Sequence, residues 1–388
     1  MRILVVHNYY QHQGGEDMVF HQEINALRQD HEVTELTFQN KTGFSGLLQF
    51  LSYPFNLIAS NRIKRAIKDS RPDVVHIHNI HYASGPMIIS AVNSSRIPIV
   101  MTLHNYRLIC PSATLFYKNS IFTNSLTENF PWTAVKLGVL DNSVLKSFWV
   151  ACSYWIHKKL GTFHKINTFI VLSDFAKSVF LKSKINLPSD NFAVKGNYVA
   201  DPQMSPQAKG ESFIFIGRLA EEKGILPLIE ALKGTSHFLK IFGAGPQQHE
   251  VERLTADVPN ITYFGFQEND VIQQHLIDAN ALLVPSICYE GMPMTILESF
   301  ALSTPVISSN IGILAKMVIP LYTGLHFDPF EKRSIIASLD QWQSLDSSVK
   351  SSIGANCRKE YIDKYTPTRN MSTLIAIYKN VILNTKQS

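Results

Sequence analysis

The chain has 388 residues, of which 45% are hydrophobic and 17% are charged. This composition is that of a globular protein, and the length allows two domains with separate cores. The formal charge of +5 is compatible with binding anionic nucleotides or a negative membrane surface but demonstrates neither.

The cysteines and the N-terminus indicate a cytoplasmic protein. Cys110, Cys152, Cys288 and Cys357 form no CxxC pair, which fits unpaired thiols in a reducing cytoplasm better than a disulfide scaffold or a zinc site. Met1 leads at once into an apolar strand, so we expect no signal peptide. No run of about 18 apolar residues exists, so no membrane-spanning helix is expected.

The chain opens with a predicted strand at 2–7, followed by a loop and a helix from about Glu16 to Arg28. Gly14 and Gly15 lie where the strand gives way to the helix. In doubly wound folds the backbone approaches a phosphate or another ligand at that point. A tight turn that needs positive φ explains the glycine pair equally well, so both interpretations stay open.

A second strand is predicted at 32–38, before a largely apolar segment at 44–68 that ends in basic residues. These residues are Arg62, Lys64, Arg65 and Lys68. An apolar patch beside a basic cluster can rest on an anionic bilayer. We favour an ordinary core helix for the apolar part and keep the basic part as a candidate contact with a membrane or a lipid phosphate.

Two further strands, at 73–78 and 97–105, place histidines near their ends. His76 and His78 point to one face by strand alternation. We interpret them as structural, because the sequence offers no persuasive further metal ligand. His104 ends the second of these strands, where a parallel sheet has the mouth of its crevice, and we favour a functional role for it.

Segment 114–141 reads as an ordered excursion, and 143–160 reads as a long amphipathic helix that suits core packing and a membrane interface about equally. A strand at 168–173, a helix at 174–182 and a short strand at 192–195 complete the first half. The helix should be capped by Ser173 or Asp174.

The second half begins with a linker-like segment at 198–211 and then a strand at 213–217. Arg218 and Lys223 lie in the turn after this strand, where two cations can hold a pyrophosphate. They can equally be loose surface charges, since Glu221 and Glu222 lie beside them. Strands follow at 239–243 and 260–265, and helices at 334–345, 347–364 and 367–384.

Segment 281–309 is a predicted strand–loop–helix–strand unit, the repeat of a parallel α/β sheet. Pro293 suits the first helical position, and the helix should run from about Met294 to Leu302. The backbone N–H groups from about Met292 to Thr295 then form a ready anion site that fits a phosphate. The unit also places two acidic residues, Glu290 and Glu298, seven residues apart.

Ionised carboxylates beside a phosphate site suit recognition of sugar hydroxyls. Without their neighbours, however, the two acidic residues would read as a helix-terminal charge and a solvated helix residue. The residues around Glu290 and Glu298 decide between the sugar-binding and the helix-surface interpretations. E-G-M-P-M-T-I-L-E from Glu290 to Glu298 closely resembles the E-x7-E signature of the retaining glycosyltransferases of family four, also called glycosyl transferases group one. T-x-H-N-Y-R-L-x-C-P around His104 and G-R-L-x-x-E-K-G around Arg218 resemble motifs of the same family.

The resemblance implies the GT-B fold, an α/β architecture of two Rossmann-like, doubly wound domains that face a central cleft. It places an acceptor-side domain at 1–198, a donor domain at 199–366 and a C-terminal helix at 367–388 that returns to the first domain. Two departures stand out: the excursion at 114–141 lacks the extra cysteines of some relatives, and Lys316 stands where Glu is common.

The resemblance also assigns roles to residues. It implies that His104 and Glu290 are the catalytic pair, with Glu290 holding hydroxyls of the transferred sugar and His104 orienting the sugar or the acceptor. It implies a donor-binding set, with Glu298 on the ribose and Arg218 and Lys223 on the diphosphate. The complete donor-binding set is Gly14, Gly15, Asn197, Arg218, Lys223, Gly265, Phe266, Gly291, Met292, Pro293, Met294, Thr295 and Glu298.

The expected reaction is transfer of a sugar from a nucleotide donor, UDP-linked in preference to GDP-linked, to a glycan or lipid-linked acceptor of bacterial surface polysaccharide synthesis. Neither a cofactor nor a metal is expected, because the cations and the helix N-terminus carry the phosphate charge. We expect no nucleic-acid partner, and at most a peripheral contact with the inner face of an anionic membrane. A nucleotide-sugar epimerase of the same architecture and a catalytically silent scaffold of a glycan-assembly complex are the alternatives.

Overall fold

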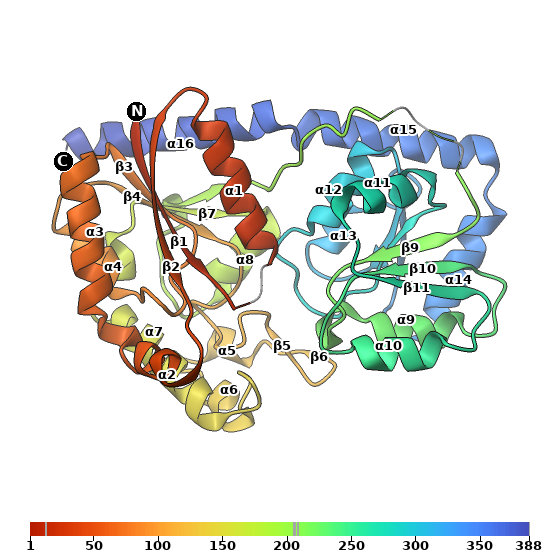
Figure 1. Cartoon of the computed structure of the whole chain (residues 1–388), viewed down its shortest axis with the longest axis horizontal. Helices are drawn as coiled ribbons and strands as arrows, with labels where there is room; N and C mark the ends of the chain where they lie inside the picture. The colour runs from red at the N-terminus through yellow and green to blue at the C-terminus, as the bar shows by residue number, and fades with distance from the viewer. Residues whose placement is uncertain (12–13, 205–206, 208, 388) are drawn as a thin grey trace. The chain divides into compact units, whose positions relative to one another are not determined.

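The computed structural model describes residues 1–388 except 12–13, 205–206, 208 and 388. The described chain forms two compact units, each an α/β layer structure (Figure 1). Unit 1 contains residues 1–115, 122–197 and 367–388, and unit 2 contains 116–121 and 198–366. Two Rossmann-like parallel sheets with covering helices confirm the predicted fold class.

The sheet of unit 1 has six parallel strands in the order β2-β1-β3-β4-β7-β8. Its strands are β1 (Arg2–Tyr9), β2 (Glu32–Gln39), β3 (Val74–Ile77), β4 (Ile99–Leu103), β7 (Thr168–Val171) and β8 (Phe192–Val194). The central strands are continuous apolar runs because helices cover both of their faces. The strand order changes direction between β1 and β3, so loops diverge there and leave room for a ligand.

The helices of unit 1 include α1 (Gly15–Leu27), α2 (Gly43–Leu51), α3 (Leu57–Ser70), α4 (Met87–Asn93), α5 (Asn124–Thr127), α6 (Trp132–Leu137), α7 (Val144–Lys159), α8 (Asp174–Lys182) and α16 (Pro367–Gln387). Short 3₁₀ turns lie at Tyr53–Phe55, Phe163–Lys165 and Ser189–Asn191. Ser173 caps α8, since its hydroxyl accepts from the Ala176 N–H at 3.1 Å. The C-terminal helix α16 buries Leu374 and Tyr378 in one core with β1 and α1, so it belongs to unit 1.

Unit 2 repeats the design, with six parallel strands in the order β11-β10-β9-β12-β13-β14. Its strands are β9 (Phe213–Ile216), β10 (Leu239–Phe242), β11 (Ile261–Gly265), β12 (Leu282–Val284), β13 (Val306–Ser309) and β14 (Gly324–Phe327). The order reverses between β9 and β12. One large apolar core fills the space between this sheet and its helices.

The helical elements of unit 2 are η4 (Glu221–Lys223), α9 (Ile225–Leu232), α10 (Gln248–Thr255), α11 (Asn269–Asp278), α12 (Met294–Ala301), α13 (Leu314–Met317), α14 (Lys332–Ser344) and α15 (Ser347–Lys364). The helix predicted from Met294 is therefore present. Pro293, however, is its N-cap in extended conformation rather than its first helical residue. Lys316 is exposed on α13.

Two features differ from the sequence interpretation. The hairpin β5 (Phe116–Tyr117) and β6 (Ser120–Ile121) belongs to unit 2, although the flanking chain belongs to unit 1. The Asn119 N–H donates to a Glu221 carboxylate oxygen at 3.0 Å, and Phe116 packs against Ile287 and Cys288.

The second difference concerns α2 and the start of α3, which were expected to be core. Large apolar side chains of α2, of the 3₁₀ turn that follows it and of the start of α3 are exposed: Phe44, Leu47, Leu48, Leu51, Phe55, Leu57 and Ile58. In α3 the buried positions begin only at Ala59. The expectation failed because apolar composition alone does not show whether any other element covers a helix.

Candidate active site

The predicted residues of unit 2 meet where the loops after β9, β10 and β12 converge. The Leu219 N–H donates to the Ala244 carbonyl at 2.9 Å, and the Ile287 N–H donates to the Glu222 carbonyl at 2.9 Å. These bonds join the loop after β9 to the loops on either side of it. The site therefore lies at the reversal point of the sheet, where open α/β folds bind ligands.

Two glycines make this convergence possible. Gly224 has φ +69°, and a Cβ there would lie 2.0 Å from the Pro285 carbonyl oxygen. Gly243 has φ +137°, and a Cβ there would lie 1.9 Å from the Gly217 carbonyl oxygen. Only glycine fits such a contact in that backbone conformation.

Lys223 and Glu290 form the centre of the site. The Lys223 ammonium donates to Glu290 Oε1 at 2.7 Å, and the Ser286 hydroxyl donates to the same oxygen at 2.6 Å. Burial acts to raise the pKa of Glu290, but Lys223, Ser286 and Arg218 outweigh it and hold that pKa below its ordinary value. Glu290 is thus a fixed carboxylate, and the ammonium of Lys223 retains donors for a further acceptor.

Arg218 is the exposed cation of the site. Its guanidinium pairs with Glu222 four residues later, and 61% of its side chain is exposed. This i,i+4 ion pair is one that an ordinary surface arginine would also form. Its position just after β9 still places it in the same loop as Lys223.

Glu298 lies inside α12, half-buried and without a side-chain hydrogen bond or ion pair among the described residues. Burial raises its pKa to about 7. An ordinary ionised carboxylate was instead expected from the sequence at this position. Gly291, Met292 and the N-cap Pro293 precede the helix, Met294 and Thr295 begin it, and all five are half-buried.

Gly265 is the last residue of the edge strand β11, and Phe266 follows it. β10 separates this strand from β9. Gly265 has φ +71°, and its carbonyl accepts from the Gly243 N–H at 2.8 Å. Phe266 is 70% exposed and therefore available to a flat ring such as a base. Unit 2 thus gathers Arg218, Lys223 and Glu290 at adjacent loops.

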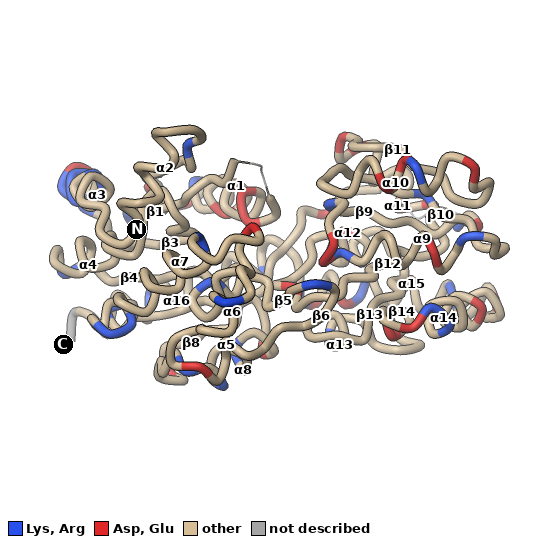
Figure 2. Tube along the Cα trace, turned by 90° about the horizontal axis from the view of Figure 1, so that it is seen from below, with Lys and Arg blue, Asp and Glu red and all other residues tan. Residues whose placement is uncertain are grey.

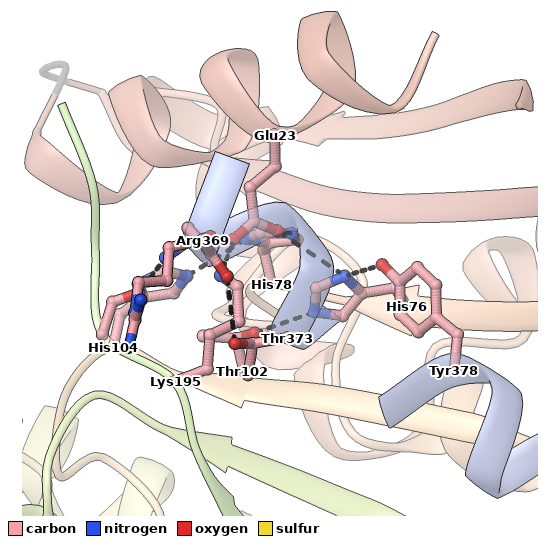
Figure 3. Close-up of polar contacts among 11 residues, drawn as sticks. Glu23, His76, His78, Thr102, His104, Lys195, Arg369, Thr373 and Tyr378 are labelled. Atoms are coloured by element: carbon pink, nitrogen blue, oxygen red, sulfur yellow. Dashed lines mark hydrogen bonds and ion pairs between the residues drawn. The ribbon is translucent and has the colours of Figure 1, made fainter. Parts of the chain in front are cut away.

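The predicted residues of unit 1 centre on His104, which is half-buried after β4. His104 Nε2 lies 3.1 Å from His78 Nδ1, and His78 Nε2 lies 3.3 Å from Glu23 Oε2 (Figure 3). Burial and the nearby His78 hold the pKa of His104 well below its ordinary value, so the ring is neutral.

Glu23 anchors this network from α1. Its other oxygen pairs with the Lys195 ammonium, and both side chains are almost fully buried (Figure 3). Although burial opposes ionisation, Lys195 and the histidines hold the pKa of Glu23 well below its ordinary value. Glu23 Oε2 and His78 Nε2 form no hydrogen bond within the described chain, so their 3.3 Å approach is a close polar contact only. His104 meets His78 through Nε2, and its Nδ1 lies outside that contact.

Glu23, His76 and His78 are close enough together to be considered as metal ligands. His76, however, bonds Thr102 through Nε2 at 2.8 Å and Tyr378 through Nδ1 at 2.7 Å. Lys195 already supplies the positive charge beside Glu23. The three residues therefore fit a polar network better than a metal site.

Gly14 and Gly15 have neither a positive φ nor a close contact, since a Cβ at either position would meet nothing within 4 Å. The interpretation that Gly14 and Gly15 form a tight turn with positive φ is therefore wrong. Gly14 caps α1 through its N–H, which donates to an Asp17 carboxylate oxygen at 2.8 Å.

Asn197 ends the 122–197 segment of unit 1 and is buried.

Sequence reasoning missed Glu23, Lys195 and Ser286. A single Glu within an amphipathic helix reads as solvated, and Glu23 lies 172 residues from Lys195 in the sequence. A usable signal for Glu23 was its place on the face of α1 that also buries Phe20 and Leu27.

Comparison with known proteins agrees with this arrangement. The family model for "Glycosyl transferases group 1" matches residues 201–360, and the model for "Glycosyltransferase Family 4" matches 13–186. The two models fall in unit 2 and unit 1 and together cover most of the chain. The chain belongs to the family 4, group 1 glycosyltransferases.

The glycosyltransferase has curated relatives of modest identity. It is 23% identical over 341 residues to the uncharacterized glycosyltransferase MJ1178 of Methanocaldococcus jannaschii, covering 84% of this chain and 83% of the relative. It is 25% identical over 275 residues to the putative teichuronic acid biosynthesis glycosyltransferase TuaC of Bacillus subtilis, covering 67% and 59%. Another relative, MJ1607 of M. jannaschii, is 28% identical but covers only 43% and 44%.

Solved structures of the same fold cover the whole glycosyltransferase. Sucrose-phosphate synthase from Thermosynechococcus elongatus superposes with a TM-score of 0.72 at 15% identity, over 99% of this chain and all of the other. Anabaena HepE in complex with UDP gives 0.69 at 15% identity, over 98% and 100%. These likenesses confirm the expected GT-B fold.

Proposed function

We propose that this glycosyltransferase moves a sugar from a nucleoside diphosphate, UDP in preference to GDP, to a glycan or lipid-linked acceptor with retention of configuration. The observation that carries the proposal is the Lys223–Glu290 pair at the reversal point of the unit 2 sheet, beside Arg218 and the start of α12. Crystal structures of the neighbour HepE contain UDP and UDP-glucose, which favours UDP here.

In the proposed mechanism, unit 2 stabilises the leaving diphosphate. Lys223 keeps ammonium donors beyond its bond to Glu290, and Arg218 is free to turn from Glu222 because its side chain is largely exposed. With the N–H groups at the start of α12, these cations would carry the charge that develops on the phosphate. This is why we propose that no metal is required.

Glu290 would hold hydroxyls of the transferred sugar, since its position is fixed by Lys223 and Ser286. Glu298 would contact the ribose. His104 from unit 1 would orient the sugar or acceptor through Nδ1, the ring nitrogen that does not face His78. Gly14, Gly15 and Asn197 would border the donor, as Gly265 and Phe266 would border the base.

A peripheral position at the inner face of a membrane is part of the proposal. The exposed apolar surface of α2 and the start of α3, defined above, adjoins a basic stretch of α3 that Figure 2 shows in blue. Apolar area beside cations is the composition of interfacial helices. Among the described residues, no helix is long and apolar enough to cross a bilayer. The name of TuaC, which refers to teichuronic acid, favours a role in polysaccharide synthesis.

The test is incubation of the purified chain with a panel of UDP- and GDP-sugars while release of the nucleoside diphosphate is measured. We expect one donor to be consumed, and proton NMR coupling of the product to show the anomeric configuration of the donor. Inversion would refute retention. Formation of an epimer without an acceptor would instead identify an epimerase, and the absence of any reaction or binding would identify a silent scaffold.

A further inference from the structure

We propose that a pocket in unit 1 binds the phosphate group of a lipid phosphate. The pocket is walled by the segment after β4, by α5 and the chain after it, by α7 and by the chain after α8. The inference deepens the proposed function. It rests on that function only where it identifies the ligand with the acceptor or with a lipid of the membrane. The pocket itself is independent of the donor residues.

Three cations line the pocket: Arg107, Lys158 and Lys184. None forms an ion pair with a carboxylate in the described part of the chain. Lys158 is half-buried, and burial together with Lys159 and Lys184 lowers its pKa. Like charges gathered without an ion-paired carboxylate are unfavourable, so a bound anion would stabilise this arrangement.

Glu128, the carboxylate on the pocket wall, forms no ion pair with these cations within the described chain. Both oxygens of Glu128 are occupied by Thr133, one by its N–H at 3.1 Å and the other by its hydroxyl. Glu16 lies near enough to act on the charge of Arg107 but forms no ion pair with it. With Glu128 included, the three cations still leave the pocket lining with a net positive charge that is available to a ligand.

Two buried polar atoms of lining residues lack a hydrogen-bond partner within the described chain. They are Arg107 Nε and the Ser125 hydroxyl, whose residue is 3% exposed. Arg107 is held in place because its Nη1 donates to the Pro111 carbonyl at 2.7 Å. Buried polar atoms rarely stay unpaired, and both of these groups can donate to a phosphate oxygen.

The size of the pocket limits the group that enters. Its volume is about 40 Å³, whereas a cavity needs only roughly 10–15 Å³ on the same measure to hold one water. The space therefore accommodates several small polar atoms, such as the oxygens of a phosphate group. Three cations also match a dianionic phosphate better than a single carboxylate.

An aromatic surface continues from the pocket to solvent. Trp155 lines the pocket and lies 6.0 Å from the Phe130 ring, which lies 4.5 Å from the Trp132 ring. Phe148 adjoins Trp132 at 6.3 Å. Trp132 is 53% exposed, and Phe148 is also exposed. An apolar surface that leads away from a cationic pocket suits an amphiphile, with its phosphate in the pocket and its chain on the aromatic rings.

The experiment is calorimetric titration of the full chain with dodecyl phosphate below its micelle concentration and with inorganic phosphate. We expect saturable binding of dodecyl phosphate at one site. Lys158→Met with Lys184→Met keeps the apolar stems and should weaken both ligands about tenfold or more. Trp132→Ser should weaken dodecyl phosphate only. Lys182→Met, an exposed lysine near Lys184 that does not line the pocket, should bind as the wild type.

The Arg218→Ala variant separates this proposal from the donor site, because it should retain dodecyl phosphate binding. Unchanged affinity in the double lysine variant, or binding that disappears in Arg218→Ala, would overturn the pocket proposal. Retained binding in a chain that uses no nucleotide sugar would leave the pocket proposal standing and defeat the proposed function. Phosphatidylglycerol vesicles identify the source: reduced vesicle binding by the double variant indicates a bulk membrane lipid, and unchanged vesicle binding indicates a lipid-linked acceptor.

Discussion

At the scale of single residues, the two acidic members of the E-x7-E motif differ in charge state. Glu290 is ionised because Lys223 and Ser286 compensate its burial. Glu298 has burial without such compensation, which raises its pKa to about 7. A hydroxyl-bearing ligand would supply the hydrogen bonds that Glu298 lacks and so favour its ionised form.

The Glu298→Gln variant tests this difference through stability. Because the folded-state pKa is raised above the ordinary 4.5, the folded protein binds more protons than the unfolded chain between those values. Glu298 should therefore lower the stability of the wild type relative to Glu298→Gln as pH rises from about 4.5 to 7, by on the order of 1–3 kcal/mol, with no further change above that range. Buried histidines with a lowered pKa, such as His104, act in the opposite direction in both proteins, so thermal denaturation compares the two curves. If the stability–pH curve of Glu298→Gln parallels the curves of the wild type and of the exposed control Glu211→Gln, the raised pKa of Glu298 is refuted.

The Glu23–Lys195 pair makes a second prediction at this scale. Lys195→Met leaves the buried Glu23 carboxylate without its cation, which should cost about 3–5 kcal/mol in denaturant unfolding. Adding Glu23→Gln should recover part of that loss, since the unpaired charge is then removed. Additive losses in the two single variants would contradict the coupling.

At the scale of elements, the β12–loop–α12–β13 unit was predictable from sequence. β12 is an apolar run and β13 begins with the apolar pair Val306 and Ile307, while Pro293 and Pro305 flank the helix between them. The network around His104 was not predictable, because it depends on which residues the fold brings to β3 and β4. His76 and His78 were expected on one face, and their rings lie 4.2 Å apart, but their carboxylate partner comes from α1.

Gly224 and Gly234 give a matched test of the loop packing in unit 2. Both have positive φ, +69° and +76°, so alanine imposes similar backbone strain at each. Gly224→Ala also drives a methyl group into the Pro285 carbonyl, whereas Gly234 has nothing within 4 Å. We expect Gly234→Ala to cost about 1 kcal/mol and Gly224→Ala at least about 2 kcal/mol more by denaturant unfolding. Equal losses would show that the loops are not held in this contact.

At the scale of the whole molecule, a large apolar surface on unit 1 is uncovered in the described structure. Replacing Leu48 and Ile58 by serine should reduce cosedimentation with phosphatidylglycerol vesicles by about tenfold, since both side chains are exposed on the α2–α3 surface. Ile362→Ser, an equally exposed apolar residue of unit 2, is the control and should change nothing. Vesicle binding that is insensitive to the first pair would place the membrane contact elsewhere.

The central claim is that the turn after β9 holds the diphosphate of a nucleotide donor. Calorimetric titration with UDP tests it most directly, with two variants of similar surroundings. Arg218 and Arg253 are both exposed, and each pairs with a Glu three or four residues away, so neither removal threatens the fold. Arg218→Ala should weaken UDP binding about tenfold or more, and Arg253→Ala should leave it unchanged. Equal UDP affinity in the two variants, or no binding of UDP or GDP by the wild type, would contradict the assignment.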